Sequence, residues 1–173
     1  MAQHWVFAYG SNMHRGDLLR WHRRKRRPHP VIDTACPAVL HHYELVFNYF
    51  SPVRQGGAAN VQPREGACVH GVALRLDTDT LANLDHKEGR PHAYDRSLQP
   101  LDVDGHGHVQ AWVYEVIPSR RSPTFVAPHR DYLQLMLEAG ATFGFAPTYL
   151  AKLSRTEAQE SLTALPDRHS EQE

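Results

Sequence analysis

The alternation of apolar and polar positions divides the chain into strands followed by helices. An apolar run at 4–8 is typical of a short buried strand, and Tyr43, Leu45, Phe47 and Tyr49 alternate as a half-buried strand does. The same criteria predict further strands at 58–62 and 67–76, a hairpin of 93–103 with 108–117, and helices over about 13–22, 79–88, 129–143 and from Pro147. Strands dominate the middle and helices the end. This order indicates an α+β fold with a small mixed or antiparallel sheet that can close into a barrel flanked by helices.

Residues with special backbone or capping roles mark where these elements begin and end. Asn12 or Ser11 is expected to cap the first helix, and Asp77 or Thr78 the second. Pro63 is expected to end the strand at 58–62, since proline cannot donate to a strand ladder.

Length and composition favour one globular domain. The chain has 173 residues, which predicts a single domain over 1–155 and a polar, partly disordered tail at 156–173. A formal net charge of +0 gives no global field to recruit nucleic acid or a membrane surface. No apolar run approaches the ~20 residues of a membrane span. The two cysteines, Cys36 and Cys68, cannot form a disulfide framework, and with no signal peptide recognised at the start a cytoplasmic setting is expected.

The turn after the first strand is the first candidate for chemistry. Tyr9, Gly10, Ser11 and Asn12 follow the apolar run directly, and such a turn can aim several backbone N–H groups at one anion. A plain strand-to-helix corner is the alternative. The sequence lacks the second glycine of a nucleophile elbow around Ser11, and it lacks the lysine of a phosphate loop. The functional interpretation of this turn is therefore an anion-binding site made of backbone N–H groups.

A second candidate is the glutamate at the end of the helix predicted at 79–88. Glu88 stands just before Gly89, where the helix dipole presents its negative end. A half-buried carboxylate in that position is suited to general acid/base work. On these grounds alone, an exposed glutamate at a helix end is the favoured alternative.

Histidines and a basic run offer weaker candidates. Neither His106 with His108 nor His41 with His42 supplies three ligands with a carboxylate, so no metal site is predicted. The run at 20–27 is rich in arginine and contains a tryptophan that could stack on a base. With a neutral chain and no nucleic-acid motif, a solvated basic segment is favoured, and no nucleic acid or membrane partner is expected.

Three segments taken together resemble the gamma-glutamylcyclotransferases. Their order and spacing over roughly 5–153 carry the resemblance, more than any one motif. The segments are Phe7-Ala8-Tyr9-Gly10-Ser11-Asn12, then Leu84-Asp85-His86-Lys87-Glu88-Gly89 with Tyr94, and finally Pro128-His129-Arg130-Asp131-Tyr132 followed by Gly140 and Pro147-Thr148-Tyr149. The basic run at 20–27 is not part of the family's pattern.

The resemblance implies a small mixed α/β fold around a barrel, with no metal and no organic cofactor. It implies that Glu88 is the catalytic acid/base, that segment 6–11 cradles a γ-glutamyl group through backbone N–H groups, and that Tyr132 lines the pocket. The substrate-binding residues implied in this way are Val6, Phe7, Ala8, Tyr9, Gly10, Ser11, Asn12, Tyr94 and Tyr132. The expected reaction is release of 5-oxoproline from a small γ-glutamyl amide by attack of the α-amine on the γ-carbonyl.

Several alternatives stay open at the level of sequence. A non-catalytic γ-glutamyl or small-molecule binding module can be built on the same fold. The sequence does not fix which amine leaves or what role the 20–27 run has. It also leaves the assembly state open, with a homodimer as one alternative.

Overall fold

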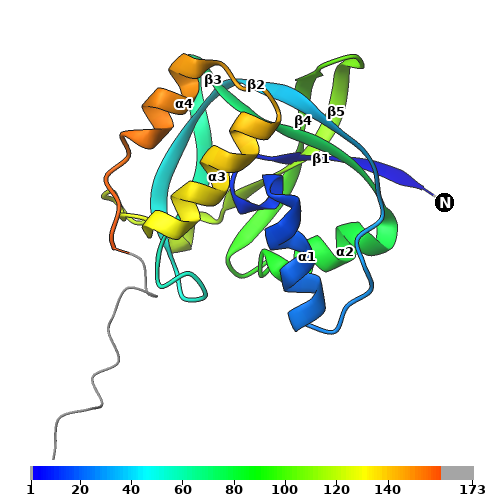
Figure 1. Cartoon of the computed structure of the whole chain (residues 1–173), viewed down its shortest axis with the longest axis horizontal. Helices are drawn as coiled ribbons and strands as arrows, with labels where there is room; N and C mark the ends of the chain where they lie inside the picture. Colours follow the sequence, from blue (N-terminus) through cyan, green and yellow to red (C-terminus); the bar gives the residue numbers. More distant parts are fainter. Residues whose placement is uncertain (1, 161–173) are drawn as a thin grey trace, which may run out of the picture.

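Five strands close into a barrel in the order β1-β3-β2-β4-β5. The computed structural model describes residues 2–160, and Figure 1 shows their arrangement. The strands are β1 (Gln3–Ala8), β2 (Ile32–Ser51), β3 (Gly56–Asp77), β4 (Tyr94–Val103) and β5 (Gly107–Val116). The helices are α1 (Arg15–Arg24), α2 (Thr78–Lys87), α3 (Arg130–Thr142) and α4 (Pro147–Ser154), with short 3₁₀ turns at Ser11–Met13 and Pro118–Arg120. The predicted α+β barrel flanked by helices is confirmed.

The barrel closes because β1 pairs on both of its sides. It runs antiparallel to β3, with Phe7 opposite Ala73, and parallel to β5, with Phe7 opposite Val113. The predicted hairpin is present as β4 and β5, which pair along their whole length from Tyr94 opposite Val116. The first strand of the chain therefore lies inside the closed sheet and cannot fray, which fixes the turn that follows it.

The two longest strands differ from their sequence prediction. The ranges 58–62 and 67–76 belong to one strand, β3, of 22 residues, and β2 extends to 20 residues. Pro63 does not end β3: it lies opposite Tyr43, beside a register shift between His41 and Tyr43. At such an irregularity the ladder does not depend on the N–H that proline lacks, so the strand continues through it.

The helix caps agree with the sequence prediction in one case and not in the other. The first helix begins at Arg15, because His14 Nδ1 accepts from the Asp17 N–H at 3.1 Å. Ser11 and Asn12 do not cap it and lie in the preceding 3₁₀ turn. For α2 the predicted cap is present: Asp77 Oδ1 accepts from the Thr80 N–H at 2.8 Å.

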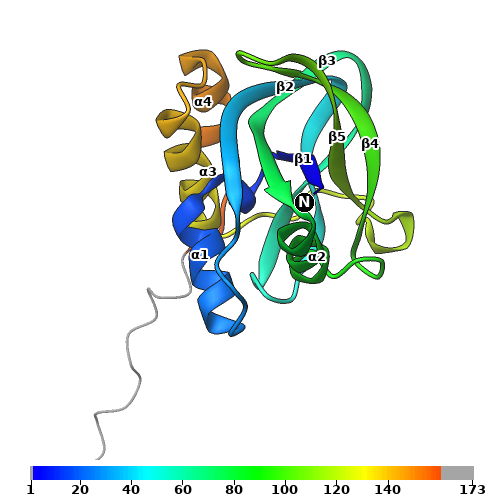
Figure 2. The same cartoon turned by 90° about the vertical axis from the view of Figure 1, so that its right-hand side faces the viewer.

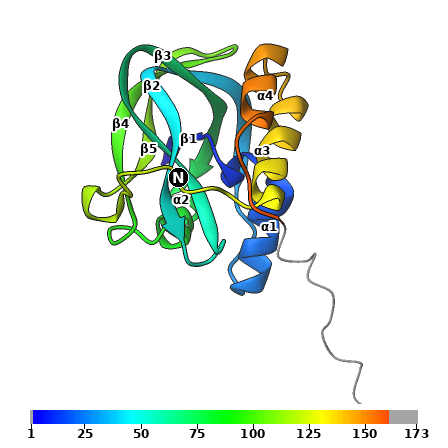
Figure 3. The same ribbon diagram turned by 90° about the vertical axis from the view of Figure 1, so that its left-hand side faces the viewer.

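The helices cover one side and one end of the barrel. Figures 2 and 3 show α1, α3 and α4 along one side, with β4 and β5 on the opposite side and α2 across one end. Leu18 of α1, Leu84 of α2 and Met136 of α3 are all fully buried against the strands. Burying a side chain of this size contributes about 1.5–3 kcal/mol, so packing fixes each helix on the barrel. The ends of β1, α2 and α3 thereby become rigid platforms.

Part of the predicted tail is hydrogen-bonded to the domain. The Gln159 N–H donates to the Pro128 carbonyl at 2.8 Å, and the Gln159 carbonyl accepts from the Arg130 N–H at 2.9 Å. The remainder of that tail, 161–173, lies outside the described residues. Within 2–160, no helix combines the length and apolar character that a bilayer crossing demands.

Candidate active site

The glycine turn and Glu88 meet directly, although they are far apart in the sequence. Asn12 Nδ2 donates to Glu88 Oε1 at 2.9 Å. Glu88 is the C-cap residue directly after α2, and its side chain is 16% exposed. The structure thus brings together the anion-binding candidate and the acid/base candidate, and the carboxylate is half-buried rather than a solvated helix-end glutamate.

Asp85 anchors the end of α2 on the barrel wall. Its carboxylate accepts from Arg96 Nε at 2.7 Å and Nη2 at 3.0 Å, and from the Tyr114 hydroxyl at 2.6 Å. Burial acts to raise the pKa of Asp85, but the hydrogen bonds from Arg96 and Tyr114 outweigh it and lower the pKa. The ionised anchor ties α2 to β4 and β5, and so sets where Glu88 points.

Gly10 is required by space. A Cβ at this position would lie 2.8 Å from the Tyr132 hydroxyl oxygen and 3.4 Å from the Ala59 Cβ. Its φ is −115°, so left-handed backbone is not the reason for glycine here. Tyr132, in the first turn of α3, is buried, and its hydroxyl accepts from the Ala59 N–H at 3.1 Å. The turn is therefore packed against the tyrosine hydroxyl that the sequence placed in the pocket.

Two further tyrosines surround the same point as neutral groups. The Tyr94 hydroxyl donates to the Ala59 carbonyl at 2.8 Å, and the Tyr9 hydroxyl donates to the Tyr114 carbonyl. Burial, followed by the charge of Glu88 in the case of Tyr9, raises the pKa of both hydroxyls well above their usual value. Neither hydroxyl ionises near neutral pH, so both serve as fixed dipoles that hold the walls in place.

The remaining predicted binding residues lie upstream in β1 or inside the turn. Val6, Phe7 and Ala8 are buried, and their backbone is engaged by β3 and β5. Ser11 is buried, and its carbonyl accepts from the His14 N–H at 3.0 Å. These buried residues fix the position of the turn.

Three charged residues around Glu88 were not singled out by the sequence. Lys87 Nζ donates to Asn12 Oδ1 at 2.7 Å and lies 3.7 Å from Glu88 Oε1. Asp17 of α1 accepts from Arg54 Nη2 at 2.7 Å, and the Arg54 guanidinium lies 5.3 Å from the Tyr132 ring centroid. Burial acts to raise the pKa of Asp17, yet Arg54 and then Lys87 outweigh it and lower the pKa. Two cations and two carboxylates therefore alternate beside the turn.

No local pattern marks these three residues. Lys87 stands in the last turn of α2, where a basic residue is expected to point into water. Asp17 and Arg54 come from α1 and from the turn between β2 and β3. Only the closure of the barrel and the packing of α1 bring them together. The one signal that the sequence offered was the position of Lys87 next to Glu88.

The weaker sequence candidates lie elsewhere. His41 and His108 both contact the Asp102 carboxylate at the surface. Across 2–160, His, Cys, Asp and Glu side chains form no group of three or more suited to a metal ion. In the basic run, Trp21 is buried, which removes its indole from the surface.

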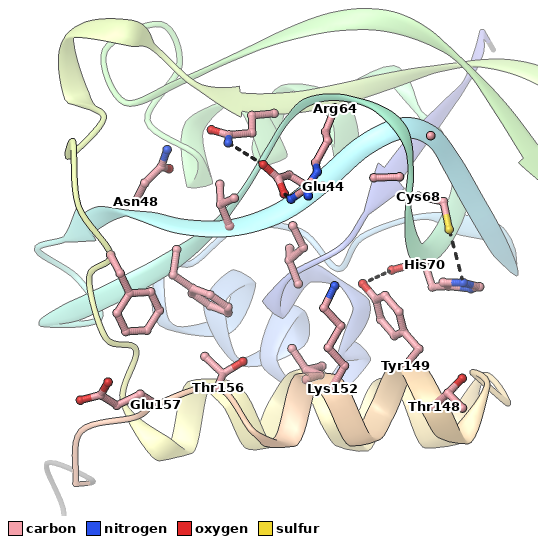
Figure 4. Close-up of a pocket in the computed structure, with 18 of the residues that line it drawn as sticks. Glu44, Asn48, Arg64, Cys68, His70, Thr148, Tyr149, Lys152, Thr156 and Glu157 are labelled. Atoms are coloured by element: carbon pink, nitrogen blue, oxygen red, sulfur yellow. Dashed lines mark hydrogen bonds and ion pairs between the residues drawn. The ribbon is translucent and has the colours of Figure 1, made fainter.

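A groove of about 1350 Å³ lies on another face, between α4 and the strands β2 and β3. Figure 4 shows Lys152 pointing from α4 toward Glu44 and Arg64 on the strands, and Tyr149 pointing toward His70. Its lining does not include Glu88, Asn12 or Tyr132. We call this groove the α4 groove. It is separate from the candidate active site.

The match to a known family covers the segment that contains this site. Residues 6–134 match the gamma-glutamyl cyclotransferase, AIG2-like family. The chain belongs to this family. The matched range includes β1, the glycine turn, α2 with Glu88, and the start of α3 with Tyr132, and ends before α4. A search of curated proteins finds no match.

Solved structures agree on the fold. A gamma-glutamyl cyclotransferase superposes with a TM-score of 0.78 at 21% identity, covering 96% of this chain and 95% of its own. An uncharacterised human protein gives 0.74 at 22% identity, with 92% and 90% covered. A yeast gamma-glutamyl cyclotransferase described as specific to glutathione gives 0.60 at 15% identity, with 88% and 94% covered. At these identities the likeness shows a shared cyclotransferase-type fold.

Proposed function

We propose that this chain is an active cyclotransferase, which releases 5-oxoproline from a γ-glutamyl amide with Glu88 as general acid/base. The observation that carries the proposal is the contact of Glu88 with the glycine turn through Asn12, at 2.9 Å. In this contact, the carboxylate to which we assign the proton transfers lies beside the turn expected to hold the substrate. A module that only binds a γ-glutamyl group would also use this carboxylate, as the partner of the α-ammonium, so turnover is the property that separates an enzyme from such a module.

The reaction needs orientation and two proton transfers. Glu88 takes a proton from the α-ammonium of the γ-glutamyl group, and the freed amine attacks the γ-carbonyl carbon to form a five-membered ring. The bond from that carbon to the leaving nitrogen then breaks, and Glu88 returns the proton to the departing amine. A second proton leaves the ring nitrogen through Glu88 in the same way, so that the products are the neutral lactam and the free ammonium. Because the attack is intramolecular, holding the γ-glutamyl group of the substrate in the conformation for ring closure lowers the barrier by several kcal/mol.

Groups already in place can stabilise the charge that develops on the γ-carbonyl oxygen. The Tyr132 hydroxyl accepts from Ala59 N–H, which leaves its own proton for a substrate oxygen. Burial raises the pKa of Tyr132, so the hydroxyl stays neutral and can donate. We assign this donor role to Tyr132. We assign binding of the α-carboxylate to the backbone N–H groups of the 9–12 turn.

The leaving amine is the open part of the proposal. The yeast relative's description names glutathione, and we include glutathione among the candidate substrates, with γ-glutamyl amino acids and amines. Cys36 and Cys68 are both free, which fits the cytoplasmic setting expected from the sequence.

The test is 5-oxoproline release from a panel that varies only the amine. Wild-type chain should turn over at least one member, and Glu88→Gln should lower kcat by about a hundredfold or more. Glu65→Gln, at a 91% exposed side chain, is the matched control and should keep wild-type kcat. Undiminished turnover by Glu88→Gln would reject Glu88 as the base. Binding of γ-glutamyl compounds without turnover of any would favour the non-catalytic module.

A further inference from the structure

Lys87 is unusual in being a buried lysine next to the candidate base. Its side chain retains only 8% exposure, and burial lowers the pKa of its ammonium while the charges of Glu88 and Asp17 oppose that effect. Lysine is seldom buried this far without a function or a strong partner. The charged groups that face it are Glu88 on its own helix end, Asp17 from α1 and Arg54 from the β2–β3 turn.

The contact of Lys87 with Asn12 decides which way the Asn12 amide faces. A lysine ammonium can only donate, so Asn12 must present Oδ1 to it. The Asn12 Nδ2 group is then turned toward Glu88 Oε1, as the distances of 2.7 Å and 2.9 Å record. This N–H donor fixes the position of Glu88 Oε1 beside the turn.

The contacts of Asn12 and Lys87 are with the same carboxylate oxygen. Asn12 Nδ2 donates to Oε1, and Lys87 Nζ lies 3.7 Å from it. This leaves Oε2 as the oxygen for an incoming ammonium. If the Asn12 amide were reversed, its carbonyl oxygen would face the Glu88 oxygen, and two acceptors cannot form a hydrogen bond, so Glu88 would lose the contact that holds it beside the turn.

We propose that Lys87 is a positioning residue that acts through Asn12 to keep Glu88 ready to accept the substrate's proton. Lys87 itself exchanges no proton in the reaction. Substrate binding by the turn and by Tyr132 does not depend on it. This inference rests on the proposed function, since it concerns how Glu88 performs its role there.

Two substitutions at Lys87 separate orientation from bulk and from charge. Lys87→Met keeps the length but cannot donate, so the Asn12 amide loses one of the two contacts that orient it. Lys87→Gln carries an NH₂ group that can donate to Asn12 Oδ1 without a positive charge. Lys152→Met, at an exposed lysine of the α4 groove, is the matched control.

The measurement is kcat and KM for 5-oxoproline release across pH. Lys87→Met should lower kcat by about tenfold with KM little changed, because Glu88 is less well placed to accept the proton. Lys87→Gln should recover most of the lost kcat, and Lys152→Met should match wild type. Wild-type kcat in Lys87→Met, or an equal loss in both Lys87 variants, would overturn the inference.

A second readout does not depend on turnover. The side-chain NH₂ resonances of Asn12 in the ¹⁵N-labelled chain should move in Lys87→Met and stay near wild type in Lys87→Gln and Lys152→Met. Unmoved resonances in Lys87→Met would overturn the inference even if the wild-type chain is inactive. Inactivity of the wild-type chain, in contrast, counts against the proposed function alone.

Discussion

The candidate active site and the α4 groove hold the same kinds of charge in different surroundings. Each contains a glutamate near a lysine and an arginine. Around Glu88 these groups are enclosed, whereas in the groove Arg64 is 65% exposed and contacts Glu44 in water. Hydrogen bonds from Arg64 and then Gln62 lower the pKa of Glu44, so this pair is formed, but solvent screens it.

The difference shows what enclosure adds to a carboxylate. An exposed ion pair contributes little, and its side chains can part without much cost. A buried charge that loses its partner is strongly destabilising, so each member of the enclosed set is held to one position by the others. The groove can therefore lose a charge with little effect on the free energy of unfolding, whereas the site around Glu88 loses stability when a charge is removed.

The largest expected effect is the loss of the buried carboxylate of Asp17. Asp17→Asn leaves Arg54 and Lys87 without one of their two counter-charges at a position where the aspartate side chain is 10% exposed. We expect the free energy of unfolding in urea to fall by about 3 kcal/mol. Glu44→Gln, the equivalent change in the α4 groove, should leave it within the error of the measurement. Equal effects of the two substitutions would contradict the comparison.

A smaller effect is expected when a single hydroxyl is removed from each region. Tyr132→Phe leaves the buried Ala59 N–H without its acceptor, which should cost about 1–2 kcal/mol of unfolding free energy. It should also lower kcat if the hydroxyl stabilises the γ-carbonyl oxygen. In the groove, the Tyr149 hydroxyl donates to the His70 carbonyl at a longer 3.3 Å. Tyr149→Phe should therefore cost less and leave kcat unchanged, and a kcat loss in Tyr149→Phe alone would reverse the assignment of the two regions.

The sequence could predict features that depend on near neighbours. The Asp77 cap, the β4–β5 hairpin and the helix at α2 follow from residues a few positions apart, and all are present. The meeting of the glycine turn with Glu88 was expected only through the family resemblance. Periodicity alone could not place a helix end beside a turn 76 residues away.

Features that depend on register or on tertiary packing were missed. The continuation of β3 through Pro63 depends on an irregularity in β2, which no property of Pro63 reveals. The reason for Gly10 is the Tyr132 hydroxyl, which arrives from α3. Lys87 at a helix end looks like a favourable surface charge until α1 and the β2–β3 turn cover it. A local pattern could not reveal these features, because it carries no information on what packs against a residue.

The smallest expected effect is on the acid side of the stability curve. The pKa of Asp17 is lowered in the folded chain, because Arg54 and Lys87 outweigh the effect of burial. The native state therefore binds fewer protons at this group than the unfolded chain, whose aspartate pKa is about 3.9. The stabilisation is fully present above that value and is lost as the pH falls through the lower, folded pKa.

Urea unfolding between about pH 6 and pH 2 tests this sign. Wild-type chain should lose stability below about pH 4, and Asp17→Asn should show a shallower decline over the same range. Glu44 also has a lowered pKa, but it is paired in water, so Glu44→Gln should follow the wild-type slope more closely. If Glu44→Gln flattened the decline and Asp17→Asn did not, the acid sensitivity would belong to the groove, and the enclosed charges around Glu88 would not be the ones that depend on their partners.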